Sequence, residues 1–114
     1  MNLFEETTEV LEKNNKSWDD VEFISTSVRD SSGPRELNLE TFLNIAKKTD
    51  YDEGFGASEI SLNLYVVGED WWLERYEYDG SEGWRYKEKP QRPRKKINEA
   101  KALLLDENLG ILDK

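Results

Sequence analysis

The chain has 114 residues, of which 36% are hydrophobic and 36% are charged, and its formal net charge is −9. This length fits one domain with a single modest core, in which aromatic rings must supply much of the buried surface. The absence of cysteine excludes disulfides, thiol nucleophiles and cysteine-type zinc sites, and the absence of histidine removes the most common general base.

The apolar runs and the first residues bear on localisation. No stretch approaches the run of about 20 apolar residues that a membrane-spanning helix needs. Met1 is followed by no basic and then apolar signal segment. We therefore expect a soluble, cytoplasmic protein with no membrane partner and no cofactor.

Charge is distributed unevenly along the chain. Residues 85–101 contain eight basic and two acidic residues, whereas residues 1–84 and 102–114 are each net acidic. Acidic surface repels a phosphate backbone and a basic segment attracts it. The simplest interpretation of the acidic excess is solubility.

Two helices and a strand are predicted in the first half of the chain. Asn2 has the spacing of an N-cap, with Glu5 three residues later, and predicts a helix that ends near Lys13. β-Branched and aromatic residues within 19–29 predict a strand. Asn38 is placed to cap a second helix, whose apolar stripe we expect in the core. This stripe consists of Leu39, Phe42, Leu43 and Ala46.

Residues 50–56 form an acidic segment with two glycines, which we interpret as a loop. A helix-loop-helix calcium site needs an acid or amide at its fifth position and a glutamate at its twelfth. Counted from Asp50, these positions hold Gly54 and Ser61. We therefore expect no resident metal at the acids of this loop, which are Asp50, Asp52 and Glu53.

Three successive antiparallel strands are predicted at residues 60–67, 71–78 and 84–89, because hydrophobic and polar residues alternate there. With the earlier strand and the helices, they predict the α+β class. The expected sheet is largely antiparallel, has about four strands, and carries two to three helices on one face. We expect this three-strand meander to form the core.

The hairpin within residues 71–89, which we expect at the centre of the sheet, contains three of the four tryptophans and an Asp-Gly step. A two-residue loop at 80–81 would mix aromatic residues with cations across the strands. A five-residue loop at 79–83 is favoured, because cross-strand aromatic and opposite-charge pairs each add about 0.2–1 kcal/mol. The expected pairs are Tyr78 with Trp84, Tyr76 with Tyr86 and Glu77 with Arg85.

A basic, proline-containing segment follows the hairpin. Pro90 and Pro93 forbid both a strand ladder and a helix, so residues 90–94 are predicted to be an extended linker. Residues 95–114 are predicted to hold a last helix, from about Ile97, and a tail. The chain is thus one domain, with its sheet-and-helix core in residues 1–89.

A double tryptophan followed by Leu-Glu-Arg, and then Glu-Tyr-Asp-Gly-Ser-Glu, is a specific combination of motifs. With it, the chain resembles a family of small uncharacterised proteins encoded by phages and prophages of Gram-positive bacteria. The resemblance covers roughly residues 18–93 and implies an accessory role in the host cytosol, without implying an activity. It rests on Trp18-Asp19-Asp20-Val21, the helix from Leu39 to Ala46, Tyr51-Asp52-Glu53-Gly54-Phe55-Gly56, the run from Val67 to Arg75, and the run from Glu77 to Glu82.

Two carboxylates, Glu74 and Glu77, flank Arg75, and such a pair can perform acid–base catalysis when burial raises the pKa of one. No histidine, cysteine or phosphate-binding loop accompanies them. We expect Arg75 and Glu77 to form a structural ion pair. The protein is predicted not to be an enzyme and to have no catalytic, cofactor-binding or metal-binding residues.

Binding is the expected function. We favour a phage accessory protein that binds a host or phage protein, for example as an acidic inhibitor of a host nucleic-acid-binding or defence protein. The alternative is single-stranded nucleic-acid binding by the aromatic and basic hairpin at residues 71–96. The two functions differ in whether the basic segment from Arg85 to Lys96 adjoins exposed aromatic rings or is neutralised by acidic neighbours. The candidate interaction residues are Trp71, Trp72, Arg75, Tyr76, Tyr78, Asp79, Trp84 and Arg85.

Overall fold

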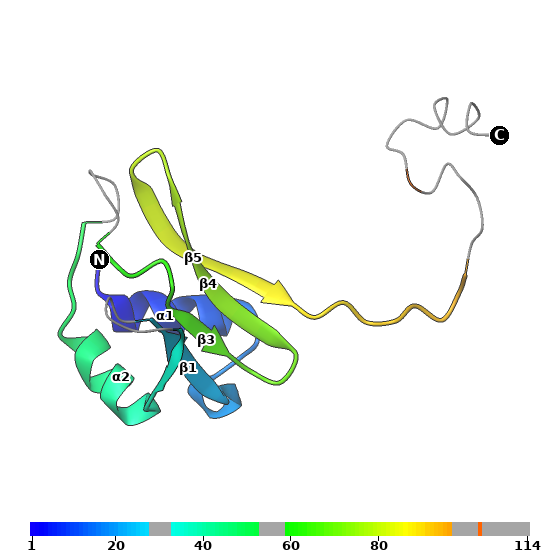
Figure 1. Ribbon diagram of the computed structural model, residues 1–114, viewed down its shortest axis with the longest axis horizontal. Helices are drawn as coiled ribbons and strands as arrows, with labels where there is room; N and C mark the ends of the chain where they lie inside the picture. The colour runs from blue at the N-terminus through cyan, green and yellow to red at the C-terminus, as the bar shows by residue number, and fades with distance from the viewer. Residues whose placement is uncertain (28–32, 53–58, 97–102, 104–114) are drawn as a thin grey trace.

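The computed structural model describes residues 1–27, 33–52, 59–96 and 103. Within these residues the chain forms two α-helices, one short 3₁₀ helix and a five-stranded sheet (Figure 1). The predicted C-terminal helix lies outside the described residues. The elements in chain order are α1 (Leu3–Lys13), η1 (Trp18–Asp20), β1 (Phe23–Thr26), β2 (Arg35–Leu37), α2 (Leu39–Lys47), β3 (Tyr65–Val67), β4 (Trp71–Tyr78) and β5 (Ser81–Glu88).

Both helices begin at the predicted asparagine caps. The side chain of Asn2 accepts a hydrogen bond from the Glu5 N–H at 3.1 Å, and that of Asn38 accepts one from the Thr41 N–H at 3.2 Å. Each bond satisfies a backbone donor that has no partner inside the helix. The predictions of these two helices are confirmed.

The strands are all antiparallel and lie in the order β2-β1-β3-β4-β5. The α+β class and the β3-β4-β5 meander are confirmed. β2 was not anticipated, because its three residues are too few to show an alternating pattern. The β4-β5 hairpin lies at one side of the sheet, so the expectation that it is central was wrong.

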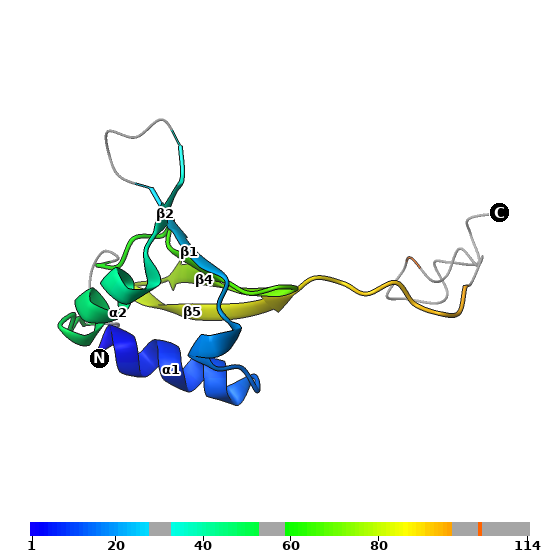
Figure 2. The ribbon, with the colours of Figure 1, turned by 90° about the horizontal axis from the view of Figure 1, so that it is seen from below.

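One face of the sheet is buried. Ile24 on β1 lies opposite Val66 on β3, and Val66 lies opposite Leu73 on β4. Each of the three is 0% exposed. Figure 2 shows α1 on one side of the sheet, and α2 packs against α1 and β1. The buried core consists of Leu3, Leu11, Ile24, Phe42, Ala46, Tyr51, Ile60, Leu64, Val66, Trp71, Leu73 and Trp84.

The β4-β5 hairpin has a two-residue turn at Asp79 and Gly80, with φ angles of 51° and 86°. Two positive φ values define a type I′ turn, whose twist matches that of the flanking strands. The favoured five-residue loop was therefore wrong. An odd shift in register moves a side chain to the other face, and here it places Trp84 on the face of Trp71 and Arg75 instead of the face of Tyr76 and Tyr78. The observed pairs include Tyr78 with Ser81, Glu77 with Glu82, Tyr76 with Gly83, Arg75 with Trp84, and Glu74 with Arg85.

Two predicted strands are shorter than expected. The strand predicted at 60–67 begins only at Tyr65, because the Leu64 N–H turns back to the Ser61 carbonyl at 3.3 Å. Ile60 and Leu64 are buried, but Leu62, which lies between them in the alternating pattern, is 50% exposed. The apolar residues at 60 and 64 therefore indicated burial and did not indicate a strand. The strand predicted within 19–29 covers Phe23–Thr26, and the short helix η1 precedes it.

After β5 the chain leaves the sheet as an extended segment (Figures 1 and 2). Residues 90–96 form neither helix nor strand, and all of them are exposed. Where the segment begins, the Lys89 N–H donates a hydrogen bond to the Asp70 carbonyl at 2.7 Å. In the described part of the chain, no helix is both long enough and apolar enough to cross a membrane.

Candidate interaction surface

The eight predicted interaction residues are divided between the two sides of the hairpin. Trp71, Arg75 and Trp84 lie on the buried face and are 2%, 6% and 8% exposed. A partner therefore reaches none of these three on the folded protein. The remaining five are partly or fully accessible: Trp72, Tyr76, Tyr78, Asp79 and Arg85.

Arg75 is the centre of a buried polar cluster. Its Nη1 lies 3.3 Å from Glu6 Oε1 on α1, and its Nη2 lies 3.1 Å from Glu82 Oε1 on β5. Nη2 also donates to the Tyr51 hydroxyl at 3.1 Å, and that hydroxyl donates to Glu6 Oε1. The expected pair of Arg75 with Glu77 was wrong, because Glu77 lies toward the hairpin tip and accepts from the Gly80 N–H.

Tyr51 and Arg75 both keep their protons near neutral pH. Burial and the hydrogen bond to Glu6 raise the pKa of Tyr51 well above its usual range, so the phenol stays protonated. Burial lowers the pKa of Arg75, but its hydrogen bond to Tyr51 and the charge of Glu6 outweigh that effect and raise it overall. A permanently charged guanidinium thus lies at the centre of the cluster, where it joins α1 to β5.

Glu82 joins a loop to the same cluster. Its carboxylate accepts hydrogen bonds from the backbone N–H of Glu59 at 2.8 Å and of Ile60 at 3.1 Å. Four segments therefore meet at Arg75: α1, the chain at Tyr51, the chain at residues 59–60, and β5. No local spacing in the sequence could show this set, because Glu6 and Arg75 are 69 residues apart.

The opposite side of the sheet, which we call the open face, is not covered by α1 or α2 (Figures 1 and 2). Two cross-strand rows define it. Phe23, Val67, Trp72 and Lys87 form one row, and Ser25, Tyr65, Glu74 and Arg85 form the other. Next to them, Tyr76 lies opposite Gly83. Sequence reasoning missed Phe23 and Tyr65, each 37% exposed, although their alternation with buried Ile24 and Val66 was the available signal.

Cations and rings are organised around Glu74 on the open face. Glu74 Oε1 accepts a hydrogen bond from Trp72 Nε1 at 2.7 Å, and Glu74 Oε2 lies 3.4 Å from Lys87 Nζ. The Arg85 guanidinium lies 5.2 Å from the centre of the Tyr76 ring, within cation–π range. These contacts fix the orientation of both aromatic side chains at the surface.

The ring of Tyr76 has room because its cross-strand partner is a glycine. A Cβ atom on Gly83 would lie 3.0 Å from the Tyr76 hydroxyl and 3.1 Å from its ring. Aromatic rings often cover a glycine in a neighbouring strand. Gly83 thus lets Tyr76 lie close to the sheet beneath Arg85.

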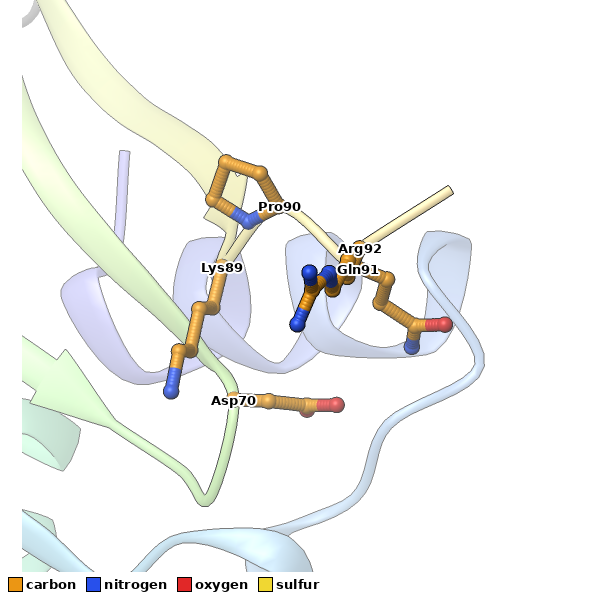
Figure 3. A pocket seen from close by; sticks show the side chains of 5 residues that line it. All are labelled: Asp70, Lys89, Pro90, Gln91 and Arg92. Atoms are coloured by element: carbon orange, nitrogen blue, oxygen red, sulfur yellow. The ribbon is translucent and has the colours of Figure 1, made fainter. Parts of the chain in front are cut away.

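An open hollow of about 430 Å³ lies where β5 gives way to the basic segment. Figure 3 shows the side chains of Asp70, Lys89 and Arg92 around it, with Pro90 and Gln91 completing the lining. Its charged lining residues are one acid, Asp70, and two cations, Lys89 and Arg92. Lys89 and Arg92 thus continue the series of cations that begins with Arg85 and Lys87 on β5.

The described acids of the 50–56 segment are Asp50 and Asp52. Among residues 1–27, 33–52 and 59–96, no three carboxylates are grouped so that they could hold an ion. Asp50 accepts a hydrogen bond from the Asn2 side chain at 3.0 Å, and Asp52 N–H donates to Glu59 at 2.9 Å. Glu53 lies outside the described residues.

Comparisons with protein-family models, with curated proteins and with solved structures found no match.

Proposed function

We propose that the protein acts by binding another protein through the open face. The observation that carries this proposal is a group of partly exposed aromatic rings and an arginine on a sheet face that neither α1 nor α2 covers. Aromatic and arginine side chains are the residues most enriched at the energetic centres of protein interfaces. Trp72, Tyr76 and Arg85 are already oriented by Glu74 and by each other, so binding would order few side chains.

The position of Glu74 favours a protein partner over nucleic acid. Its carboxylate lies among the rings, between Trp72 and Lys87, and directly opposite Arg85. A phosphate backbone that followed the rings would pass close to this negative charge. The net charge of −9 adds further repulsion at longer range.

A specific observation supports single-stranded nucleic acid as a second candidate. The segment after β5 is exposed, and no ion pair within the described structure neutralises its cations. Such a segment could follow a backbone while bases stack on the open face. The cations are Lys89, Arg92, Arg94, Lys95 and Lys96.

If the protein is encoded by a phage, its partner would be a protein of the host or of the phage. An acidic protein in a host cell can present carboxylates to a protein that normally grips phosphate, and so inhibit it. Charge alone is consistent with this inhibitory role. The open face then provides the short-range contacts that charge does not.

The test is a pull-down from nuclease-treated lysate of a Gram-positive bacterium, with the full-length protein as bait. The amount of a specific partner that is retained should fall at least about tenfold for the open-face variant Tyr76→Ala/Arg85→Ala, because this variant lacks two anchor side chains. The matched control is Ile45→Ala/Lys48→Ala, on α2 and at its C-cap, which removes an exposed apolar residue and an exposed cation elsewhere. Equal loss in both variants would contradict the proposal.

Fluorescence anisotropy with a labelled oligothymidylate decides between the two candidates. The protein-binding proposal expects no measurable affinity at physiological salt. The second candidate expects micromolar affinity that falls steeply with salt. It also expects this affinity to disappear when four cations are neutralised together: Arg92, Arg94, Lys95 and Lys96.

A further inference from the structure

The outer edge of β5 is a second surface, and none of the described strands pairs with it. β5 is the last strand of the sheet, and its eight residues make it much longer than the three-residue strand β2 at the other edge. An edge strand exposes backbone N–H and C=O groups that can pair with another chain. Glu59 and Ile60 contact Glu82 near the start of β5. The free edge therefore runs from Trp84 to Glu88.

The register identifies the backbone groups that point outward. The Lys89 N–H bonds to Asp70 across from it, which places odd-numbered residues of this strand toward β4. The two-residue turn at 79–80 requires the same assignment. The backbone groups of Trp84, Tyr86 and Glu88 consequently face away from the sheet. In the described structure they have no hydrogen-bond partner.

Most charges beside this edge are positive; the exception is Glu88, which accepts a hydrogen bond from the Tyr86 hydroxyl at 2.9 Å. Arg85 and Lys87 project onto the open face, and Lys89 and Arg92 follow where the strand ends (Figure 3). Lys87 is 45% exposed despite its contact with Glu74. Self-pairing of two copies about a twofold axis would bring these cations together, so the edge disfavours a second copy of this chain.

We propose that the free edge of β5 accepts an extended acidic segment of a partner protein as a sixth strand. Main-chain hydrogen bonds to β5 would supply affinity, and contacts with alternate side chains of the segment would supply specificity. Side chains on the open face would lie beside Arg85 and Lys87, which favours carboxylates there. Those on the other face would lie beside Trp84 and Tyr86, which favours apolar residues. This inference rests on the proposed protein-binding function and specifies how the partner is held.

The probe is a synthetic peptide of about nine residues in which glutamate alternates with valine, added to the ¹⁵N-labelled full-length protein. The peptide should slow amide hydrogen exchange of Trp84 and Tyr86 by at least about tenfold, because their N–H groups gain acceptors. The amides of Arg85 and Lys87 already bond to β4 and should change little. A peptide with lysine in place of glutamate should produce no protection.

A pair of variants tests the backbone contact itself. Tyr86→Pro removes an outward N–H without removing a bond to β4, and Tyr86→Ala removes the same side chain but keeps the N–H. The proline variant should bind the peptide at least about tenfold more weakly than the alanine variant. Thermal melting of both variants checks that the fold persists.

The outcomes separate this inference from the function on which it rests. Equal peptide affinity for the two Tyr86 variants would overturn edge pairing. So would hydrogen exchange in the wild type that slows equally at Trp84, Arg85, Tyr86 and Lys87. If edge pairing fails while the open-face variant still loses its protein partner, only the further inference is wrong. If the acidic peptide does not bind and oligothymidylate protects the open-face residues instead, both proposals fail.

Discussion

The guanidinium of Arg75 lies 4.8 Å from the ring of Trp84, which is directly opposite it on β5. Two adjacent residues of α1 hold this pair from the other side. Glu6 contacts Arg75, and the Thr7 hydroxyl accepts a hydrogen bond from Trp84 Nε1 at 2.8 Å. The first helix and the last hairpin are therefore fixed to one another by polar contacts as well as by packing.

Replacing Arg75 with methionine should strongly destabilise the protein. The change leaves Glu6 and Glu82 buried without their cation, and breaking a buried ion pair on one side costs about 3–5 kcal/mol. Urea denaturation measures the loss in free energy of unfolding. Glu77→Gln is the control, since this exposed carboxylate makes no ion pair in the described structure, and it should change stability by less than about 0.5 kcal/mol. Similar losses in both variants would argue against a central role for the Arg75 cluster.

The neighbouring tryptophans of β4 should respond differently to truncation. Trp71 is 2% exposed in the core, so Trp71→Ala should cost about 3–5 kcal/mol. Trp72 lies on the open face and is only partly buried, so Trp72→Ala should cost clearly less. Thermal melting of the two variants gives the ranking. A Trp72 variant that melted at the lower temperature of the two would contradict the assignment of faces.

The helices and the class of fold follow from local signals, whereas the hairpin register does not. Asn2 and Asn38 cap helices through bonds to residues three positions away, so the sequence shows both. The register of β4 and β5 depends on a choice between cross-strand pairs of similar energy. In the observed register Trp84 faces α1 and donates a hydrogen bond to Thr7, which lies 77 residues earlier in the chain. Local sequence patterns do not show a contact over this separation.

The sequence predicts which residues of β4 share a face, but not which of the two faces is exposed. Alternation along β4 correctly separates Trp72 and Tyr76 from Trp71 and Arg75. It does not tell which row faces the helices, because both rows contain aromatic and charged residues. Arg75 looked like a surface residue because a buried arginine needs distant carboxylates, and spacing along the chain does not reveal them.

Two glycines near aromatic rings should differ in their tolerance of a methyl group. A Cβ atom on Gly68 would lie 2.1 Å from Nε1 of Trp71, which is buried and cannot move aside. Gly68→Ala should therefore destabilise the protein by about 1–3 kcal/mol, as overpacking does. At Gly83 the nearest atom belongs to the partly exposed Tyr76, whose ring can shift. Gly83→Ala should stay within about 1 kcal/mol of the wild type in urea denaturation.

Stability should fall at alkaline pH because of Tyr51. Its pKa in the folded protein is raised above the ordinary value of 10.0, so the folded state holds this proton more tightly than the unfolded state. The stabilisation is complete below about pH 10 and is lost as the pH rises further, by up to about 1.4 kcal/mol per pH unit. Tyr51→Phe has no proton to release at this position. The free energy of unfolding of the wild type should therefore fall more steeply than that of Tyr51→Phe above pH 10. Parallel curves would show that burial and the hydrogen bond to Glu6 do not raise the pKa of Tyr51 in the folded protein.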